Sequence, residues 1–467
     1  MGHRKIRHKV YEELEITGLS SEGLGIARVD EKVVFVEQCI PGDVVRARTF
    51  QRRKNFEKAR ILALIKPSMD RREHFCKHFE SCGGCKWQYL PYAKQIAFKD
   101  QIVSDAFARL AKVEVGARLP ILPALEKEYY RNKLEYTFST NRWFTKEEIA
   151  TGEDLDFRAL GFHVPGQHTK VVDIDKCYLQ NEFSNKLRNA VREYALEKDL
   201  VFYNIKIREG FLRNLVVRTA STGEILVILI VNEDNDELLP LMAFIKEKFP
   251  EITSLNYIIN PKLNDTYFDQ TPIAYSGQPF IIEKLGKFSF KVRPKSFFQT
   301  NTSQGERLYD VVKKFAALQG TETLYDLYAG VGSIGLYLSD NCNKLVGIEQ
   351  IDQAVEDAKE NAKLNAVENA DFHVGDVRLL LNVDFLAKNG QPDILITDPP
   401  RGGMHPEILQ TILDARVPKI VYVSCNPSTQ ARDIAALDEF YKVVKMQAVD
   451  MFPHTVHIEN VALLELK

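Results

Sequence analysis

Short runs of alternating apolar and polar residues dominate the first half of the chain. Between residues 1 and 66, turns separate the runs YEELEITGL, GIARVD, KVVFVEQ and VVRARTF. A period of two over short segments is typical of β-strands, and this spacing predicts a small antiparallel barrel. Residues 129–290 combine β-like runs with shorter helical ones, which predicts an α+β domain around an antiparallel sheet.

The pattern changes near Lys291. From there, apolar strands such as TLYDLYA, KLVGIEQ, DILITDPP and KIVYVSC alternate with helical segments such as QAVEDAKENAKLN. This alternation predicts a doubly wound, Rossmann-like α/β domain with a parallel sheet. We therefore predict three domains: a β-barrel over residues 1–66, a central α+β domain over residues 67–290 and the α/β domain over residues 291–467.

Composition places the chain among ordinary globular proteins. Hydrophobic residues make up 45% of the 467 residues and charged residues 27%, which is too apolar for a disordered chain. The longest apolar run, Ile225–Val231, is too short to span a membrane, and no apolar segment follows the first charged residues. We expect a cytoplasmic protein with neither a membrane span nor a secretory signal.

Basic residues are concentrated near the N-terminus, although the net charge of the chain is −2. In residues 44–74 they greatly outnumber the acidic ones, which are Glu57, Asp70 and Glu73. The basic residues are Arg46, Arg48, Arg52, Arg53, Lys54, Lys58, Arg60, Lys66, Arg71 and Arg72. Because they outnumber possible partners, we expect this segment to bind phosphate groups; the alternative is a solvated charged surface.

A glycine-rich turn follows the first strand of the α/β domain. Gly330, Gly332 and Gly335 form a G-x-G-x-x-G pattern between that strand and a helix, and Glu349 ends the next strand. Such glycines allow a tight turn and close approach of a ligand, while a carboxylate at the second strand can accept ribose hydroxyls. The pattern alone does not separate a dinucleotide from S-adenosylmethionine.

Two later strands end in reactive side chains. Asp398 begins the sequence Asp-Pro-Pro-Arg after one strand, and Cys425 ends the following strand, with Asn426 next. Because the ligand crevice lies at the carboxyl ends of parallel strands, we expect the carboxylate and the thiol to face it. A dehydrogenase has no evident use for these groups, so the pattern favours S-adenosylmethionine.

These motifs resemble the RNA uracil-5 methyltransferase family, whose members use S-adenosylmethionine to make 5-methyluridine. The resemblance covers nearly the whole chain and rests on SFFQTN, DLYAGVGSIGL, GIEQ, TDPPRGG, VSCNPSTQARD and HIENVALLE, in the order of the family. The N-terminal part resembles the members that act on 23S ribosomal RNA, which carry an RNA-binding TRAM barrel similar to an OB fold and a four-cysteine iron–sulfur site. Members that act on transfer RNA generally lack both.

The resemblance implies a role for each matching residue. It implies that Cys425 is the nucleophile and Glu459 the general base. Phe297 is similar to an aromatic residue near the target base, and Asp376 lies where related methyltransferases often contact the adenine. The residues implied to contact the methyl donor are Gln299, Tyr328, Glu349 and Asp398.

The chemistry of uracil explains why these residue types are needed. Carbon 5 of uracil is a weak nucleophile, so a thiolate must first add to carbon 6, and a base must later remove the proton from carbon 5. We expect Cys425 and Glu459 to do this on a uridine of 23S ribosomal RNA flipped out of its stack, with no obligate protein partner. The alternatives are a transfer-RNA uracil-5 methyltransferase, an amino-methyltransferase acting on adenine or cytosine, and a non-catalytic RNA-binding assembly factor.

Four of the seven cysteines form a candidate metal site. Cys76, Cys82 and Cys85 lie on one short segment, and Cys177 follows much later in the chain. Disulfides are improbable in a cytosolic chain, and four thiolates can hold a metal. The spacing leaves zinc and a [4Fe–4S] cluster open, whereas the resemblance implies a [4Fe–4S] cluster with a structural or RNA-positioning role.

Overall fold

The computed structural model describes residues 8–467. Residues 1–7, on which the start of the predicted barrel and part of the expectation about a secretory signal depend, lie outside the described residues. The chain folds into two compact units. The first contains the residues up to Ile102 together with Phe452–His457, and the second contains Val103–Met451 and Ile458–Lys467.

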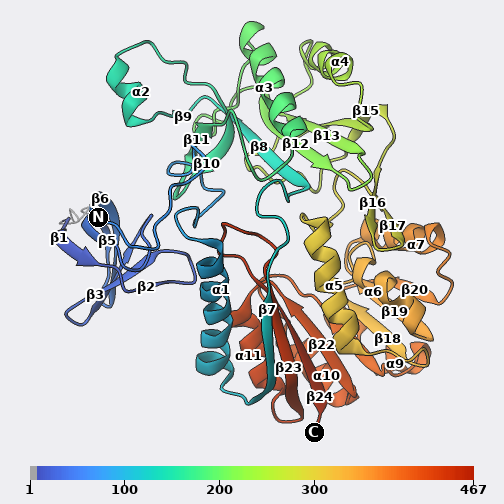
Figure 1. The fold of residues 1–467 in the computed structure, drawn as a ribbon. Helices are drawn as coiled ribbons and strands as arrows, with labels where there is room; N and C mark the ends of the chain where they lie inside the picture. The colour runs from blue at the N-terminus through green and yellow to red at the C-terminus, as the bar shows by residue number, and fades with distance from the viewer. Residues whose placement is uncertain (1–7) are drawn as a thin grey trace, which may run out of the picture. The chain divides into compact units, whose positions relative to one another are not determined.

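The first unit begins with a six-stranded sheet, drawn in dark blue in Figure 1. Its strand order is β1-β5-β6-β4-β3-β2, and all neighbours are antiparallel except β4 and β6. Alternate side chains such as Val34, Val45 and Ala47 are fully buried in its core. The strands are β1 (Val10–Glu15), β2 (Gly18–Leu19), β3 (Gly25–Val29), β4 (Lys32–Val36), β5 (Val44–Arg52) and β6 (Phe56–Lys66).

A second small core of this unit surrounds Trp87, which is 1% exposed. The loop after β6 and the returning segment 452–457 meet here, because the Lys86 N–H donates to the carbonyl oxygen of His454 at 2.7 Å. Gln95 of α1 (Tyr92–Ala106) accepts from the His454 N–H at 2.8 Å. A π-helical turn, Phe107–Ala111, continues α1.

The central part of the second unit is an eight-stranded sheet in the order β15-β14-β13-β12-β8-β10-β11-β9. The hydroxyl groups of Tyr136 in β8 and Ser184 in α3 share a hydrogen bond at 2.8 Å. This contact holds α3 against one face of the sheet (Figure 1). A hairpin of two further strands follows the sheet. The strands are β8 (Lys133–Ser139), β9 (Arg142–Trp143), β10 (Ala159–Val164), β11 (Gln167–Asp173), β12 (Leu212–Thr219), β13 (Ile225–Val231), β14 (Ser254–Ile259), β15 (Ile273–Gly277), β16 (Ile281–Leu285) and β17 (Phe288–Val292), and the helices are α2 (Lys146–Thr151), α3 (Glu182–Glu197) and α4 (Leu238–Lys248).

The central sheet is mixed, so the prediction of an antiparallel sheet was wrong in part. β13 and β14 are parallel because α4 connects them as a crossover, and parallel neighbours require such a connection. β9 and β11 are parallel as well. The remaining neighbours are antiparallel.

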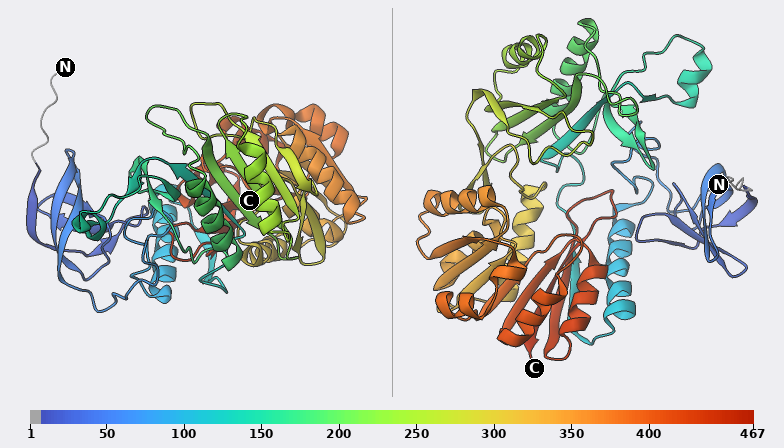
Figure 2. Two further views of the ribbon diagram at one scale, coloured as in Figure 1. Left: turned by 90° about the horizontal axis from the view of Figure 1, so that it is seen from above. Right: turned by 180° about the vertical axis from the view of Figure 1, so that it is seen from behind.

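The C-terminal part of the second unit is a second eight-stranded sheet, in the order β20-β19-β18-β21-β22-β24-β23-β7. Five neighbouring strands from β20 to β22 are parallel, and β24 joins β22 and β23 as an antiparallel strand. Helices cover both faces (Figures 1 and 2). The strands are β7 (Val115–Leu122), β18 (Thr323–Leu327), β19 (Lys344–Glu349), β20 (Ala370–Val374), β21 (Ile394–Thr397), β22 (Lys419–Ser424), β23 (Tyr441–Val449) and β24 (Glu459–Leu466), and the helices are α5 (Thr302–Ala316), α6 (Ser333–Leu338), α7 (Asp352–Leu364), α8 (Val377–Leu380), α9 (Val383–Asn389), α10 (Pro406–Ala415) and α11 (Pro427–Leu437).

This sheet confirms the predicted Rossmann-like class, but the prediction of a parallel sheet was wrong for β24, which is antiparallel to both of its neighbours. The sheet also contains one strand from a much earlier part of the chain. β7, far earlier in the sequence, pairs in parallel with β23 at the sheet edge. The division into three domains stays a prediction. Within residues 8–467, none of the helices combines the length and the apolar character needed to cross a membrane.

Candidate active site

The glycine-rich turn lies between β18 and α6, and each of its three glycines has a different structural role. Gly330 has φ +55°, and a Cβ placed on it would meet no atom within 4 Å, so its backbone borders open space. Gly332, with φ +78°, is the N-cap residue of α6. A Cβ on Gly335 would lie 2.8 Å from the Asp326 carboxylate, so this glycine allows close packing of helix on strand. These roles are those expected for a nucleotide-binding turn.

Glu349 is held at the carboxyl end of β19. Its carboxylate accepts hydrogen bonds from the backbone N–H groups of Gly330, at 2.9 Å, and Ile351, at 3.0 Å. Each carboxylate oxygen has capacity for another donor. The glycine turn and the acidic residue expected to bind a ribose are therefore joined directly, as the sequence spacing indicated.

Tyr328 and Asp376 follow β18 and β20 at the same edge of the sheet. Tyr328 adopts a left-handed backbone conformation with φ +64°. Burial, followed by the carboxyl groups of Asp376 and Asp433, raises the pKa of Tyr328 to about 12. Asp376 is the N-cap residue of α8, and its carboxylate accepts from the Arg378 N–H at 2.9 Å. The charge of the Asp376 carboxylate therefore acts on the Tyr328 hydroxyl.

Gln299 precedes α5 and is fixed by the central sheet. The side-chain amide of Asn132 donates to the carbonyl oxygen of Gln299 at 2.9 Å, and the Asn132 N–H donates to that of Thr300 at 2.8 Å. Gln299 also interacts with the hydroxyl of Tyr309, which bonds Ser333 at 2.9 Å. The segment before α5 is thus tied both to the central sheet and to the glycine turn.

Phe297 and Phe298 have different surroundings. Phe297 is 73% exposed, whereas Phe298 is 2% exposed and packs against Phe290 with ring centroids 5.5 Å apart. Phe298 is therefore a core residue. The exposed ring of Phe297 is available to contact a ligand.

Cys425 and Glu459 come from adjacent strands. β22 and β24 are antiparallel, and their last pair in register is Ser424 with Asn460. Cys425 follows Ser424 and Glu459 precedes Asn460, so both occupy the next register position. β21 lies on the other side of β22 and leads directly into Asp398. The sheet therefore brings the predicted nucleophile, the predicted base and one predicted donor-binding residue together.

The electrostatics of this cluster are dominated by burial and by two carboxyl groups. Burial, followed by Glu459 and Asp398, raises the pKa of the Cys425 thiol to about 11, while the Arg401 guanidinium opposes this rise. Burial and then Asp398 raise the pKa of Glu459, which is 7% exposed, well above the usual range of a carboxyl group. Burial raises the pKa of Asp398 to about 7. A buried acidic pair of this kind favours a cationic ligand.

Arg401 is a member of this site that the sequence did not identify. Its guanidinium lowers the pKa values of Cys425 and Glu459, against the effect of burial. Its carbonyl oxygen accepts from the Asn426 side chain at 3.1 Å and from the Thr429 hydroxyl at 3.2 Å. In the sequence, the only indication that Arg401 belongs to the site is its position directly after Asp-Pro-Pro. Asn132 was missed as well, because its partners Gln299 and Thr300 are remote in sequence.

The four cysteines of the candidate metal site belong to different units. Cys76, Cys82 and Cys85 lie on a loop of the first unit and are partly buried, whereas Cys177 is buried in the second unit. Across residues 8–467, the structure contains no group of three or more His, Cys, Asp or Glu side chains arranged to hold a metal ion.

The basic residues of the N-terminal barrel are less available than the sequence suggested. Five of the ten basic residues in residues 44–74 form ion pairs, although the ten still outnumber these five acidic partners. The ion pairs are Arg46–Glu12, Arg52–Glu57, Lys58–Glu22, Arg60–Glu37 and Arg71–Asp43. Arg46 and Glu12 meet because β5 and β1 are antiparallel neighbours, whereas the Lys58, Arg60 and Arg71 pairs each join a residue to a partner outside the strands. Arg48, Arg53 and Lys54 are exposed and have no acidic partner among the residues that the structure describes.

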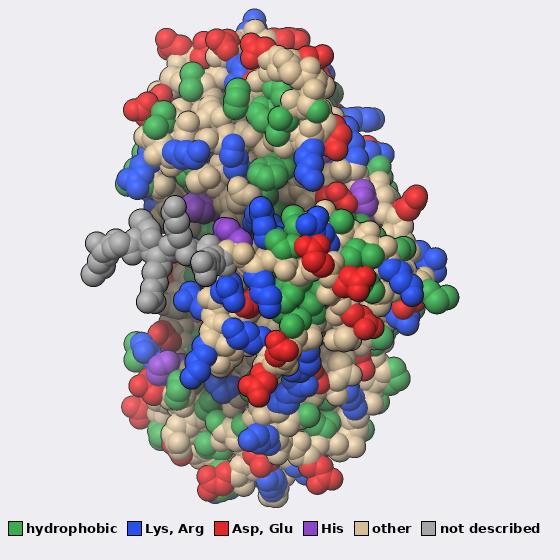
Figure 3. Space-filling model, turned by 90° about the vertical axis from the view of Figure 1, so that its left-hand side faces the viewer, with side chains coloured by type: hydrophobic (Ala, Val, Ile, Leu, Met, Phe, Trp, Pro, Cys, Tyr) green, Lys and Arg blue, Asp and Glu red, His purple; other side chains and the backbone are tan. Residues whose placement is uncertain are grey.

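The surface as drawn in Figure 3 is also of mixed charge. Lys and Arg side chains are interspersed with Asp and Glu on this face. Any binding of an anionic polymer by the barrel therefore depends on particular side chains and not on a surface of one sign.

Comparison with known proteins identifies two families of domain. Residues 279–467 match the family described as tRNA (Uracil-5-)-methyltransferase. Residues 13–69 match the family described as tRNA (uracil(54)-C(5))-methyltransferase, TRAM domain. The first match covers every strand of the Rossmann-like sheet except β7, and the second covers the N-terminal sheet from within β1.

Relatives of similar length extend the match over the whole chain. An RNA methyltransferase of Bacteroides thetaiotaomicron is 47% identical and covers 96% of this chain and 100% of its own. One of Chlorobaculum tepidum is 37% identical over 99% of this chain and 98% of its own. The crystal structure of Pyrococcus abyssi tRNA (uracil-54, C5)-methyltransferase in complex with S-adenosyl-L-homocysteine has a TM-score of 0.74 and 29% identity, covering 97% of this chain and 100% of that one.

Proposed function

Because the chain belongs to the RNA uracil-5 methyltransferase family and carries a TRAM domain, we propose that it transfers the methyl group of S-adenosylmethionine to carbon 5 of a uridine in RNA. The observation that carries this proposal is the register of β22 and β24, which places Cys425 beside Glu459. An amino-methyltransferase needs no thiol adduct, and a non-catalytic factor needs neither residue.

The residues at the sheet edge fit the methyl donor. Gly330 borders open space, and Glu349 is fixed where it can accept ribose hydroxyls. Gln299 and Tyr328 flank the glycine turn, and Asp398 belongs to a buried acidic pair that favours a cation. When bound there, the donor supplies a sulfonium methyl group as the electrophile.

The remaining chemistry falls to Cys425 and Glu459. The Cys425 thiolate adds to carbon 6 of uracil, and the electrons of the 5,6 double bond move into an enolate, which makes carbon 5 nucleophilic. After carbon 5 has gained the methyl group, Glu459 accepts the proton from that carbon. The double bond re-forms as the bond between sulfur and carbon 6 breaks, which frees Cys425.

Cys425 needs help to ionise, since its pKa is raised to about 11. Arg401 supplies part of it by favouring the thiolate. Cys425 also lies two residues before α11, which begins at Pro427 and whose N-terminal end carries partial positive charge. Both effects act at the sulfur atom and oppose the penalty of burial.

We propose 23S ribosomal RNA as the substrate, because the cysteine segment Cys76–Cys85 resembles that of the family members that act on this RNA. Transfer RNA is a second candidate, favoured by the similarity to the Pyrococcus enzyme and by the name of the TRAM family. The TRAM domain itself does not separate the two candidates, because a family of transfer-RNA enzymes is named for it.

The test offers the purified chain unmodified 23S ribosomal RNA and unmodified transfer RNA, together with isotopically labelled donor. The RNA is then digested and the labelled nucleoside is mapped by mass spectrometry. We expect labelled 5-methyluridine in 23S ribosomal RNA. Label confined to transfer RNA would reassign the substrate, and label on an exocyclic amine would reject the reaction.

The [4Fe–4S] cluster belongs to the proposal through the family resemblance alone, because the spacing of Cys76, Cys82 and Cys85, with Cys177 as fourth ligand, leaves zinc open as well. No reaction step depends on it. We expect protein purified without oxygen to be brown and to contain iron, and Cys82→Ser or Cys177→Ser to lose both. Cys342→Ser serves as the control. A colourless protein with one zinc per chain would overturn the assignment.

A further inference from the structure

A completely buried carboxylate group lies beside the candidate active site and takes no part in the proposed reaction steps. It belongs to Asp433 of α11. One oxygen accepts hydrogen bonds from the backbone N–H of Met404, at 2.8 Å, and from the Tyr422 hydroxyl, at 2.7 Å. The other oxygen accepts from Nε and Nη2 of Arg432, at 2.9 Å and 2.6 Å. The carboxylate therefore joins α11 to β22 and to the loop that follows β21.

The loop after β21 is attached to α11 at further points. The Asn426 side chain and the Thr429 hydroxyl both donate to the carbonyl oxygen of Arg401, at 3.1 Å and 3.2 Å. Nη2 of Arg432 donates to the carbonyl oxygen of Gly402 at 2.8 Å. These bonds fix the backbone that carries the Arg401 side chain.

Gly403 allows the loop to approach the buried carboxylate closely. It has a left-handed backbone conformation with φ +77°, and a Cβ placed on it would lie 2.5 Å from Asp433 Oδ2 and 2.6 Å from Arg432 Nη2. A side chain at this position would therefore push the loop away from Asp433. The second glycine of TDPPRGG is thus required by the contact with α11.

The same loop carries the positive charge that acts on the predicted nucleophile. The Arg401 guanidinium favours the thiolate of Cys425 through its charge and through a hydrogen bond, whereas the carboxyl groups of Glu459 and Asp398 oppose it. A hydrogen bond requires close approach and weakens steeply when its geometry is lost. Because Arg401 is exposed, the place of its guanidinium beside Cys425 depends on the loop backbone.

We propose that Asp433 is a positioning residue, whose buried carboxylate holds the loop after β21 in the conformation that keeps the Arg401 guanidinium beside the Cys425 thiol. This inference rests on the proposed function, since it takes Cys425 as the nucleophile. If the loop moved away, the carboxylate would lose the Met404 donor, and a buried acceptor without its donor is costly. Asp433 therefore favours the conformation in which Arg401 can act.

Two effects of Asp433 on the Cys425 thiol have opposite signs. As a negative charge acting directly, Asp433 would raise the pKa of the thiol, so its removal would lower that pKa. As a positioning residue, Asp433 keeps Arg401 in place, so its removal raises that pKa. The direction in which the pH profile of Cys425 moves therefore separates positioning from a direct effect of charge.

The test measures alkylation of Cys425 by iodoacetamide over a range of pH, in the full chain without RNA or methyl donor. The alkylated peptide is quantified by mass spectrometry. Asp433→Asn is expected to lower the rate at pH 9 several-fold and to displace the profile to higher pH. In the Arg401→Gln background, Asp433→Asn is expected to cause no further fall, because the guanidinium is already absent.

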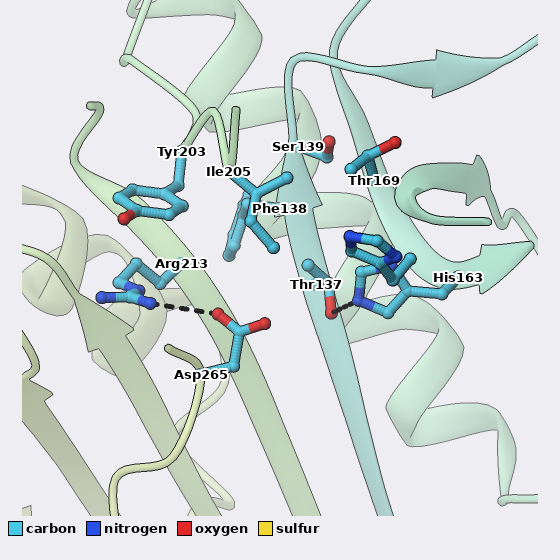
Figure 4. Close-up of a pocket in the computed structure, with 10 residues that line it drawn as sticks. Thr137, Phe138, Ser139, His163, Thr169, Tyr203, Ile205, Arg213 and Asp265 are labelled. Carbon is cyan, nitrogen blue, oxygen red and sulfur yellow. Dashed lines mark hydrogen bonds and ion pairs between the residues drawn. The ribbon is translucent and has the colours of Figure 1, made fainter. Parts of the chain in front are cut away.

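Asp265→Asn is the matched control. It also removes the acidic partner of a buried arginine, since Asp265 lies 3.0 Å from Arg213 beside a small hollow at the end of β8 (Figure 4). This hollow belongs to the central sheet, outside the candidate active site. The Asp265→Asn protein is therefore expected to keep the alkylation profile of wild type.

Arg432→Lys provides a second probe on an exposed side chain. Lysine keeps the positive charge but lacks the forked donors that reach both Asp433 and the carbonyl oxygen of Gly402. The profile should move in the same direction as in Asp433→Asn, and by less. Arg432→Lys decides the question if Asp433→Asn does not fold, and an unchanged profile would then overturn the proposal.

The folded Asp433→Asn protein can contradict the proposal in two ways. Its profile could be unchanged or displaced to lower pH, or its rate could fall equally with and without Arg401. Either result would overturn the proposal. Formation of 5-methyluridine is assayed separately, so failure of the proposed function is recognised independently of the alkylation result.

Discussion

Cys425 and Glu459 occupy facing ends of the antiparallel strands β22 and β24, and the carboxyl group of Glu459 contributes to the raised pKa of the Cys425 thiol. Both groups therefore favour their protonated forms in the absence of ligands. A carboxyl group that starts as an acid must lose its proton before it can act as the base. A cationic donor beside Asp398 and Glu459 favours that loss.

Replacement of the base should separate the two halves of the reaction. Glu459→Gln keeps the size of the side chain but cannot accept the proton of carbon 5, so release of product should fall by about 10²- to 10⁴-fold. We expect the covalent complex with RNA to accumulate and to be visible on a denaturing gel. Glu465→Gln, in the same strand and outside the site, is the control. Turnover of Glu459→Gln at the wild-type rate would remove Glu459 from the mechanism.

Arg401 should assist ionisation of Cys425. Arg401→Gln removes the positive charge that lowers the pKa of the thiol, so that pKa rises and less thiolate is present at any given pH. The rate of alkylation of Cys425 by iodoacetamide at pH 9 should fall several-fold, with the pH profile displaced to higher pH. Lys388→Gln, an exposed change in α9, controls for loss of charge. Identical profiles for Arg401→Gln and wild type would contradict the assignment.

Asp326 should make stability depend on pH. Burial raises its pKa to about 7 in the folded state, while the unfolded carboxyl group titrates near its ordinary value of about 3.9. The folded state therefore binds the proton more tightly, and the free energy of unfolding falls as pH rises between these two values. Asp326→Asn retains an acceptor for the Gly335 N–H and removes the buried charge.

We expect Asp326→Asn to gain melting temperature relative to wild type at pH 8 and to gain less, or nothing, at pH 4.5. Thermal unfolding at both pH values measures the difference, and Asp384→Asn, at an exposed position, should change neither. An Asp326→Asn protein with the pH dependence of wild type would show that Asp326 does not carry it.

The ion pairs of the N-terminal barrel divide its basic residues into two classes. Arg48, Arg53 and Lys54 are exposed and have no acidic partner within residues 8–467. Their replacement by Ala should therefore lower the slope of log affinity for RNA against log salt by roughly 0.7–0.9 for each phosphate that is no longer bound. A matched variant with Arg46 and Arg60 replaced by Ala removes ion-paired residues and should change the slope less. Equal slopes in both variants and wild type would make the barrel a solvated surface.

Local sequence patterns were sufficient to predict those site residues that lie on a strand or on the turn directly after it. Gly330, Gly332 and Glu349 could be placed because a strand, a glycine turn and the next strand tip are close in sequence. The joining of Cys425 to Glu459 was expected only from the resemblance. Its physical cause, the antiparallel insertion of β24 beside β22, is a long-range pairing that periodicity does not report.

The other features that could not be predicted from the sequence also depend on contacts between residues that are remote in sequence. Pairing of Arg46 with Glu12 and contact of Asn132 with Gln299 both depend on strand neighbours and domain contacts that no local pattern encodes. The parallel pairing of β13 and β14 could not be predicted, because the strand periodicity does not show whether the helix between them connects neighbouring strands as a crossover.

The measurement that tests the account most directly is capture of the covalent intermediate at Cys425. RNA carrying 5-fluorouridine at the target position is incubated with the chain and labelled donor, and the adduct is digested and sequenced by mass spectrometry. Because fluorine cannot be removed as a proton, the account predicts a stable adduct on the peptide containing Cys425, with the labelled methyl group on the trapped base. Cys425→Ala should form none while binding the donor within a few-fold of wild type. An adduct on another residue, or full methylation of ordinary RNA by Cys425→Ala, would contradict the mechanism.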